Sequence, residues 1–134
     1  MKVNSKQMAA VLTLPARKRF EHFIKLVADR EQVWRLYKDG WATAQTDGGE
    51  IVFPFWPAVE YAQQCAENEW SNYHPKVIPL SDFMDDVLPQ LKIDKIAPSV
   101  FYTPSNKGVV VPVDELFSAI ESELENYSVQ SDHS

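Results

Sequence analysis

Three short strand-like stretches separated by tight-turn sequences constrain the fold of this chain more than any other feature. The stretches are Gln32–Lys38, Trp41–Thr46 and Glu50–Trp56. Asp39-Gly40 separates the first two and Asp47-Gly48-Gly49 the last two, and both sequences are typical of hairpin turns. The pattern predicts a three-stranded antiparallel meander.

The predicted meander is apolar on both faces. Side chains alternate between the two faces of a strand, and apolar residues occupy both sets from Ile51 to Trp56. One face is predicted to be covered by helices, and the other by further helices, by dimerisation or by a partner protein. Pro54 cannot donate a ladder hydrogen bond, so the third strand is predicted to be an edge strand or to carry a bulge.

Apolar residues at helical spacing predict the helices. A first helix covers about residues 5–14, and Pro15 opens a second, whose apolar stripe is Ala16, Phe20, Phe23, Ile24 and Val27. Pro57 opens a third helix, with an inner face of Tyr61, Ala62, Cys65 and Ala66. Ser81 caps a fourth helix, which Pro89 interrupts. The last helix covers about residues 113–127, with the stripe Leu116, Phe117, Ile120, Leu124 and Tyr127.

The remaining patterns complete the predicted fold. Lys76–Leu80 is predicted to be a short strand, and Ala97–Thr103 and Gly108–Val111 a second hairpin. We therefore predict one α+β domain at residues 1–127, followed by a frayed polar tail at 128–134. Its antiparallel sheet, the meander plus the C-terminal hairpin, is covered by about five helices.

Charge is divided unevenly along the chain. Residues 1–38 hold nine Lys and Arg against three acids, whereas residues 39–134 hold four against 16, which together give the net charge of −6. Such a protein must pair its own halves or present surfaces of opposite sign. The basic run Arg17-Lys18-Arg19 spreads around its helix rather than over one face, and the total charge is negative, so nucleic-acid binding is not predicted.

The sequence lacks the common catalytic and cofactor motifs. Four glycines cannot supply a GxGxxG or a P-loop, and the three histidines and the single cysteine are too scattered to form a recognised zinc motif. No cofactor or metal is predicted. Cys65 is predicted to be a buried structural thiol. The carboxylates of Asp82, Asp85 and Asp86 are interpreted as solvated helix residues.

Six residues are the candidates for a ligand site. His74 lies in an aromatic loop, and histidine is the side-chain type that most readily changes charge near neutral pH. Arg19 is placed at the edge of the apolar stripe of its helix, where it needs a carboxylate, a carbonyl or a ligand anion. The four tryptophans supply aromatic surface, and the full candidate set is Arg19, Trp34, Trp41, Trp56, Trp70 and His74.

Several short motifs together resemble a known bacterial family, domain of unknown function 2750. They begin with Leu14-Pro15-Ala16, Arg19, Phe23-Ile24, Val27-Ala28-Asp29, Val33-Trp34, Gly40-Trp41-Ala42 and Phe55-Trp56-Pro57. They continue with Pro75-Lys76, Ile78-Pro79-Leu80, Phe83 and Gly108-Val109-Val110-Val111. The resemblance implies a small cytosolic bacterial protein with no assigned activity, and it carries over no catalytic residue.

Three hypotheses for function follow. The first is a non-catalytic protein–protein interaction domain, an adaptor or immunity-type inhibitor whose acidic surface meets a basic partner. The second is a small-molecule-binding domain or minor enzyme with an aromatic pocket near Arg19 and His74. The third is a self-associating structural protein, a homo-oligomer that uses the meander face or the Pro54 edge. The lone cysteine, the absence of a signal-peptide pattern and the absence of a membrane-length apolar run predict a cytoplasmic location without membrane contact.

Overall fold

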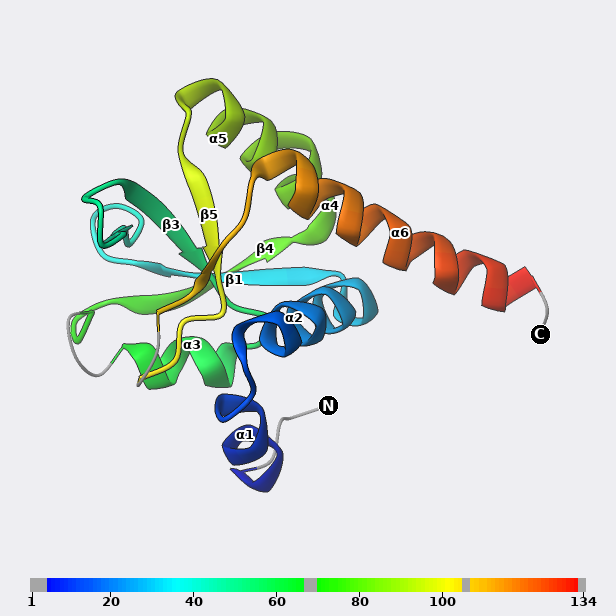
Figure 1. Cartoon of the computed structure of the whole chain (residues 1–134), viewed down its shortest axis with the longest axis horizontal. Helices are drawn as coiled ribbons and strands as arrows, with labels where there is room; N and C mark the ends of the chain where they lie inside the picture. The colour runs from blue at the N-terminus through cyan, green and yellow to red at the C-terminus, as the bar shows by residue number, and fades with distance from the viewer. Residues whose placement is uncertain (1–4, 67–69, 105–106, 133–134) are drawn as a thin grey trace.

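The chain folds into helices packed around two small sheets (Figure 1). A computed structural model describes residues 5–66, 70–104 and 107–132, and it describes side chains from Lys6 to Asn126 within these ranges. The α+β class is confirmed. The described part has five helical segments when Leu80–Asp94 is counted as one.

The strands form one two-stranded and one four-stranded sheet. Strand β1 (Gln32–Tyr37) pairs antiparallel with β4 (His74–Pro79). The second sheet has the order β2-β3-β5-β6, in which β3 and β5 are parallel and the other pairs are antiparallel. Its strands are β2 (Ala44–Gln45), β3 (Ile51–Phe55), β5 (Ala97–Val100) and β6 (Val109–Val110). Trp34 and Trp56 join the two sheets through reciprocal backbone hydrogen bonds of 2.9 Å.

The predicted meander is wrong in its first pairing. All six residues of β1 pair with β4, from Gln32 with Pro79 to Tyr37 with His74. The turn at Asp39-Gly40 does form, with a Lys38 N–H to Gly40 O bond and a bridge between Tyr37 and Trp41. The long-range partner replaces the local one because β4 offers a full six-residue ladder. The β2–β3 and β5–β6 hairpins are confirmed.

The four-stranded sheet is mixed, where an antiparallel sheet was predicted. The long connection between β3 and β5 contains helices, which permits the parallel pairing. Strand β3 is therefore an interior strand, not the predicted edge. Pro54 is tolerated because it lies between the Val52–Ala44 pair and the Trp56–Trp34 bridge, where β2 has already ended.

The first three helices lie close to their predicted positions. They are α1 (Ser5–Leu12), α2 (Ala16–Arg30) and α3 (Val59–Cys65). Pro15 is the N-cap of α2 rather than its first residue, and the predicted stripe loses Ala16, which is exposed, and gains the buried Arg19. In α3, Tyr61, Ala62 and Cys65 are buried as predicted.

The fourth helical segment differs most from its prediction. It runs without a break through α4 (Leu80–Asp82), a π-helical turn η1 (Phe83–Val87) and α5 (Leu88–Asp94). Ser81 lies inside the helix rather than at its cap, and Pro89 does not interrupt it. The Leu88 N–H bonds the carbonyl of Phe83, five residues back. We attribute the tolerance of Pro89 to this wider turn, which changes the hydrogen-bond pattern where the proline lacks a donor.

The last helix and the core complete the fold. Helix α6 covers Val113–Asp132, with Leu116 and Ile120 buried as predicted. The predicted role of Tyr127 and of the tail 128–134 falls outside the described side chains.

One cluster of buried residues contains side chains from both sheets and from every helical segment. In Figure 1, α2 and α3 contact β1, α5 contacts β5, and the later part of α6 extends away from the strands. In the described residues, no helix combines the length and apolarity of a membrane span.

Candidate functional site

A cleft of about 400 Å³ lies between the two sheets and the helical segment Leu80–Asp94. Its apolar lining comes from Trp41, Phe53, Val87 and Leu91. Its polar lining comes from Arg35, Asp86, Gln90 and Asp94. This volume lies in the range of about 300–1,000 Å³ that is usual for small-molecule sites.

Arg35 is the buried charge of the cleft. Strand alternation places it on the same face of β1 as the buried Val33, and only 6% of its surface is exposed. Three aromatic rings surround the guanidinium. Its central carbon lies 4.0 Å from the ring centre of Trp41 and 5.2 Å from those of Phe53 and Phe55. The last two share a face of β3 because they are two residues apart.

The guanidinium of Arg35 is not satisfied by the described residues. Its Nη2 is buried without a hydrogen-bond partner, and none of their ion pairs includes it. Burial lowers the pKa of Arg35 from the usual guanidinium range to about 10, because the charge is withdrawn from water without a counter-ion. Lys76, its partner across β1 and β4, carries the same charge. A buried arginine is normally paired, so this one is able to receive an anion.

The opposite wall of the cleft is a helical row of polar side chains. Asp86, Gln90 and Asp94 recur every four residues and therefore lie along one side of the segment, next to the apolar pair Val87 and Leu91. Gln90 Nε2 donates to Asp94 Oδ1 at 3.1 Å. Asp86 belongs to the π-helical turn η1, an irregularity that is frequent at functional sites.

Of the six candidate residues named from the sequence, Trp41 lines this cleft. It is 38% exposed, and it also packs edge-on against Tyr37. Trp34 is half-buried, and its indole N–H donates to Gln32 Oε1 at 3.0 Å. His74 is exposed on β4, opposite Tyr37.

Trp56 and Trp70 are core residues. Their rings meet edge-on at 5.7 Å, and Trp70 packs in the same way against Tyr102. The indole N–H of Trp56 donates to Tyr102 O at 2.9 Å, and that of Trp70 donates to Thr43 O at 3.3 Å. Cys65 is buried, as predicted, and its thiol donates to the Tyr102 carbonyl at 3.3 Å.

Arg19 is buried among backbone carbonyls. Its Nη1 donates to Phe101 O at 2.7 Å and to Lys107 O at 3.4 Å. Phe101 has a φ of +66°, in the left-handed region. Arg19 belongs to α2 and His74 to β4, and neither lines the Arg35 cleft. Of the three partners weighed for Arg19 from the sequence, the structure shows the carbonyl.

Sequence reasoning missed Arg35, Asp86 and Asp94 as members of one site. The available signal for Arg35 was its position two residues after Val33 in a strand that is otherwise apolar on that face. No local sequence signal places Leu80–Asp94 next to Arg35, because this proximity depends on the pairing of β1 with β4. In the described residues no group of three or more His, Cys, Asp or Glu is arranged to hold a metal ion.

Two comparisons with known proteins bear on this site. No curated protein matches the chain. The model of a family described as "Protein of unknown function (DUF2750)" matches residues 20–120. This range contains every residue that lines the Arg35 cleft, and it confirms the resemblance found in the sequence. The chain therefore belongs to the DUF2750 family of proteins of unknown function.

Proposed function

We propose that this protein is a binding domain for a small molecule that carries an oxyanion, with Arg35 as the anchor. The observation that carries the proposal is the unpartnered Nη2 of a buried arginine beside a cleft of ligand size. A guanidinium binds carboxylate or phosphate through parallel hydrogen bonds, and such bonds strengthen where water is excluded. The three rings fix the guanidinium in place, which reduces the entropy lost on binding.

The composition of the cleft supports binding rather than covalent catalysis. The eight lining residues include no Ser, Thr, Cys, Lys or His, so the carboxylates of Asp86 and Asp94 are the nucleophilic groups that the lining offers, without a histidine or lysine beside them in the lining. The aromatic and aliphatic walls supply apolar area, and the polar groups are few, as in most small-molecule sites.

Thermal unfolding in different anions tests the proposal. Sodium phosphate, sulfate and acetate are titrated against sodium chloride at equal ionic strength, with the wild-type protein, Arg35→Met and Arg17→Met. The side chain of Arg17 is 89% exposed and lies outside the cleft. Arg17→Met therefore makes the same change in net charge as Arg35→Met without altering the lining of the cleft. A ligand at 100 times its Kd stabilises the folded state by about 2.7 kcal/mol.

We expect at least one oxyanion to raise the Tm of the wild-type protein and of Arg17→Met, and to leave Arg35→Met at its value in chloride. Sulfate and phosphate also stabilise proteins by exclusion from their surface. An equal rise in all three proteins would therefore show a general salt effect and remove the proposal. The proposal is also removed if no compound that carries an oxyanion, whether a simple anion or an amino acid, binds the protein.

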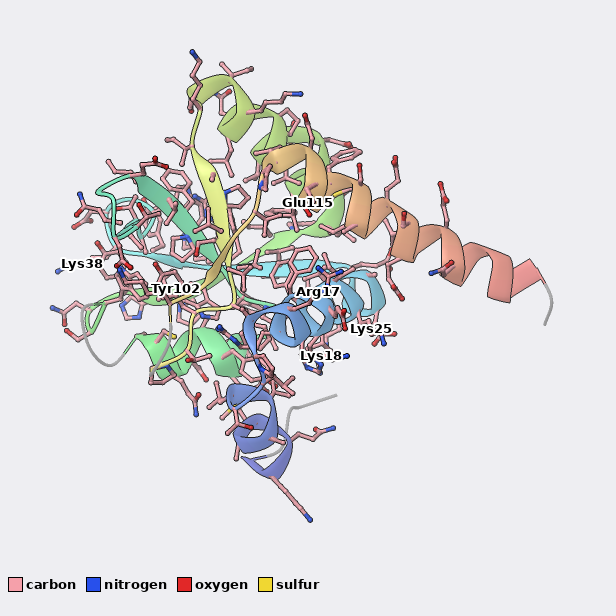
Figure 2. The ribbon with its side chains drawn as sticks, in the orientation of Figure 1. Arg17, Lys18, Lys25, Lys38, Tyr102 and Glu115 are labelled. Carbon is pink, nitrogen blue, oxygen red and sulfur yellow. The ribbon has the colours of Figure 1, made fainter. Side chains whose placement is uncertain are left out.

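The distribution of acidic residues favours a second candidate, binding of a basic protein partner. Residues 80–126 hold nine acids against three lysines, and all nine acids lie on Leu80–Asp94 and α6. Two of the lysines are engaged, Lys92 with Asp114 and Lys107 with Asp47. The basic residues Arg17, Lys18 and Lys25 lie on α2, while Glu115 lies at the start of α6 (Figure 2). Arg17 and Lys18 pair with Glu21 of their own helix.

Low-salt affinity capture with wild-type protein and a Glu121→Gln/Glu125→Gln variant tests this second candidate. A stoichiometric basic partner that is lost from the variant and released by salt would support it, since exposed charge pairs are screened. Equal capture by both proteins, or no partner, would remove it. Sedimentation of the purified protein tests the third hypothesis, self-association, for which a pure monomer at high concentration is the negative result.

A further inference from the structure

The Arg35 cleft combines a buried cation with two carboxylates that do not pair with it. Asp86 and Asp94 line the cleft and are exposed to solvent, and neither takes part in the ion pairs of the described residues. The hydrogen bond from Gln90 holds the Asp94 carboxylate on the cleft side of the helix. A ligand here meets a positive group on the sheet side and negative groups on the helix side.

We propose that the cleft selects a small zwitterion with an apolar body, the chemistry of an α-amino acid. This inference rests on the proposed function, because it takes Arg35 as the anchor of the ligand's carboxylate. The ligand's ammonium group then faces Asp86 and Asp94. Its side chain packs against the apolar part of the lining, which both walls contribute through Trp41, Phe53, Val87 and Leu91.

Charge balance favours a zwitterion over a simple anion. The polar lining carries one positive and two negative groups, so its formal charge is −1. An anion without a cationic group would bind Arg35 but would be repelled by the two carboxylates. An amine without a carboxylate would leave the buried Nη2 without a partner. A molecule that carries both charges satisfies both walls, and this double requirement is what gives selectivity.

Titration calorimetry with matched compounds tests the inference. The probes are L-leucine, L-methionine and L-phenylalanine, each with its N-acetyl derivative, which lacks the cation, and its decarboxylated amine, which lacks the anion. We expect at least one amino acid to bind about 10-fold or more tightly than either of its derivatives, because each charged hydrogen bond contributes about that factor.

Two double variants separate the helix wall from general charge effects. In Asp86→Asn/Asp94→Asn we expect the preference for the amino acid over its N-acetyl form to fall to within about twofold. Asp82→Asn/Asp85→Asn removes the same charge from exposed residues of the same helical segment that do not line the cleft, and it keeps the preference. Circular dichroism is used to check that both variants are folded.

The outcomes distinguish the two proposals. If the N-acetyl derivatives bind as tightly as the amino acids, or if only oxyanions without an amino group bind, the zwitterion inference is overturned and Arg35 remains an anion site. If neither amino acids nor oxyanions bind, both proposals fail. Equal loss of preference in the two double variants also overturns the inference, because the effect would then come from net charge rather than from the lining.

Discussion

The buried guanidinium of Arg35 costs the folded state free energy at neutral pH. Burial lowers its pKa from the usual guanidinium range to about 10, and this corresponds to a penalty of about 3 kcal/mol at about 1.4 kcal/mol per pKa unit. The three rings return about 0.5–2 kcal/mol through cation–π contact. Because the folded pKa of this base is the lower one, the penalty is fully present below about pH 10 and disappears as the pH rises from there towards the pKa of the unfolded chain.

Arg35→Met should therefore stabilise the protein while it removes anion binding. We expect the free energy of unfolding at pH 7 to rise by about 1–2 kcal/mol, since an unbranched apolar chain replaces an unpaired buried charge. Urea unfolding measures the change, and the exposed Arg17→Met should stay within about 0.5 kcal/mol of the wild-type protein. A less stable Arg35→Met protein would mean that the ring contacts outweigh the burial penalty and that Arg35 is a structural residue.

His22 makes stability depend on pH near neutrality. Burial, and then the charges of Lys25 and Arg30, lower the pKa of His22 below 6.5. As the pH falls, the unfolded chain binds this proton at a higher pH than the folded protein does. The free energy of unfolding therefore decreases as the pH falls through 6.5. Between pH 7.5 and 5.5 we expect the free energy of unfolding of His22→Gln to fall less than that of the wild-type protein. The two slopes should differ by less than about 1.4 kcal/mol per pH unit.

Urea midpoints at three pH values check the role of His22. The matched control is His74→Gln, because His74 is exposed on β4. It should keep the pH sensitivity of the wild-type protein. If His22→Gln keeps the same sensitivity as well, then another group is responsible for it.

The sequence predicted the core residues of the protein better than the charged residues of the site. Apolar alternation and helical spacing identify Phe23, Val27, Leu116 and Ile120 as interior positions, and all four are buried. The same rules place arginine and aspartate at the surface, so they cannot find a cation such as Arg35, whose burial depends on rings from a different strand.

At the scale of elements, the β5–β6 hairpin depends on a close approach at Gly108. A Cβ at this position would lie 2.5 Å from Ser99 Oγ and 2.7 Å from a ring carbon of Tyr102. Both neighbours are buried, so they have little room to move. We expect Gly108→Ala to lower the free energy of unfolding by about 1–3 kcal/mol, as overpacking does elsewhere.

Gly40→Ala is the matched control for Gly108→Ala. No atom of the described residues lies within 4 Å of a Cβ at Gly40, and its φ is outside the left-handed region. Its alanine variant should be neutral or slightly more stable, by less than about 1 kcal/mol, because the unfolded chain loses freedom. Urea unfolding measures both variants. An equal loss of stability in the two would show that the alanine substitution acts through the backbone rather than through the close approach at Gly108.

Local sequence signals located most elements and failed where pairing is non-local. The turns at Asp39-Gly40 and Asp47–Gly49 mark true chain reversals, yet β1 takes its partner from β4, about 40 residues away. Pro89 was expected to break a helix because the rule assumes α-helical bonds, and the π-helical turn before it changes the hydrogen-bond pattern.

At the scale of the whole molecule, the two sheets should unfold together. Their backbones meet at the Trp34–Trp56 bridge, and one cluster of buried side chains covers both. Small proteins with a single core usually unfold in one transition. We expect urea curves followed by far-UV circular dichroism and by tryptophan fluorescence to coincide, whereas separate midpoints would show that the sheets are independent.

Trp56 belongs to the bridge between the two sheets and also packs in the core. It is fully buried, its indole N–H donates to Tyr102 O at 2.9 Å, and its ring packs against Trp70. Trp56→Phe leaves a cavity and a buried carbonyl with one partner fewer, so we expect the free energy of unfolding to fall by about 2–4 kcal/mol with both probes still coincident.

Trp34→Phe is the matched control, because Trp34 is half-buried across the same bridge and its indole N–H donates to a side chain of its own strand. It should lose less than about 1 kcal/mol. If Trp34→Phe costs as much as Trp56→Phe, the buried indole of Trp56 contributes no more to stability than the half-buried one of Trp34. If the two probes separate in Trp56→Phe alone, that indole couples the unfolding of the two sheets.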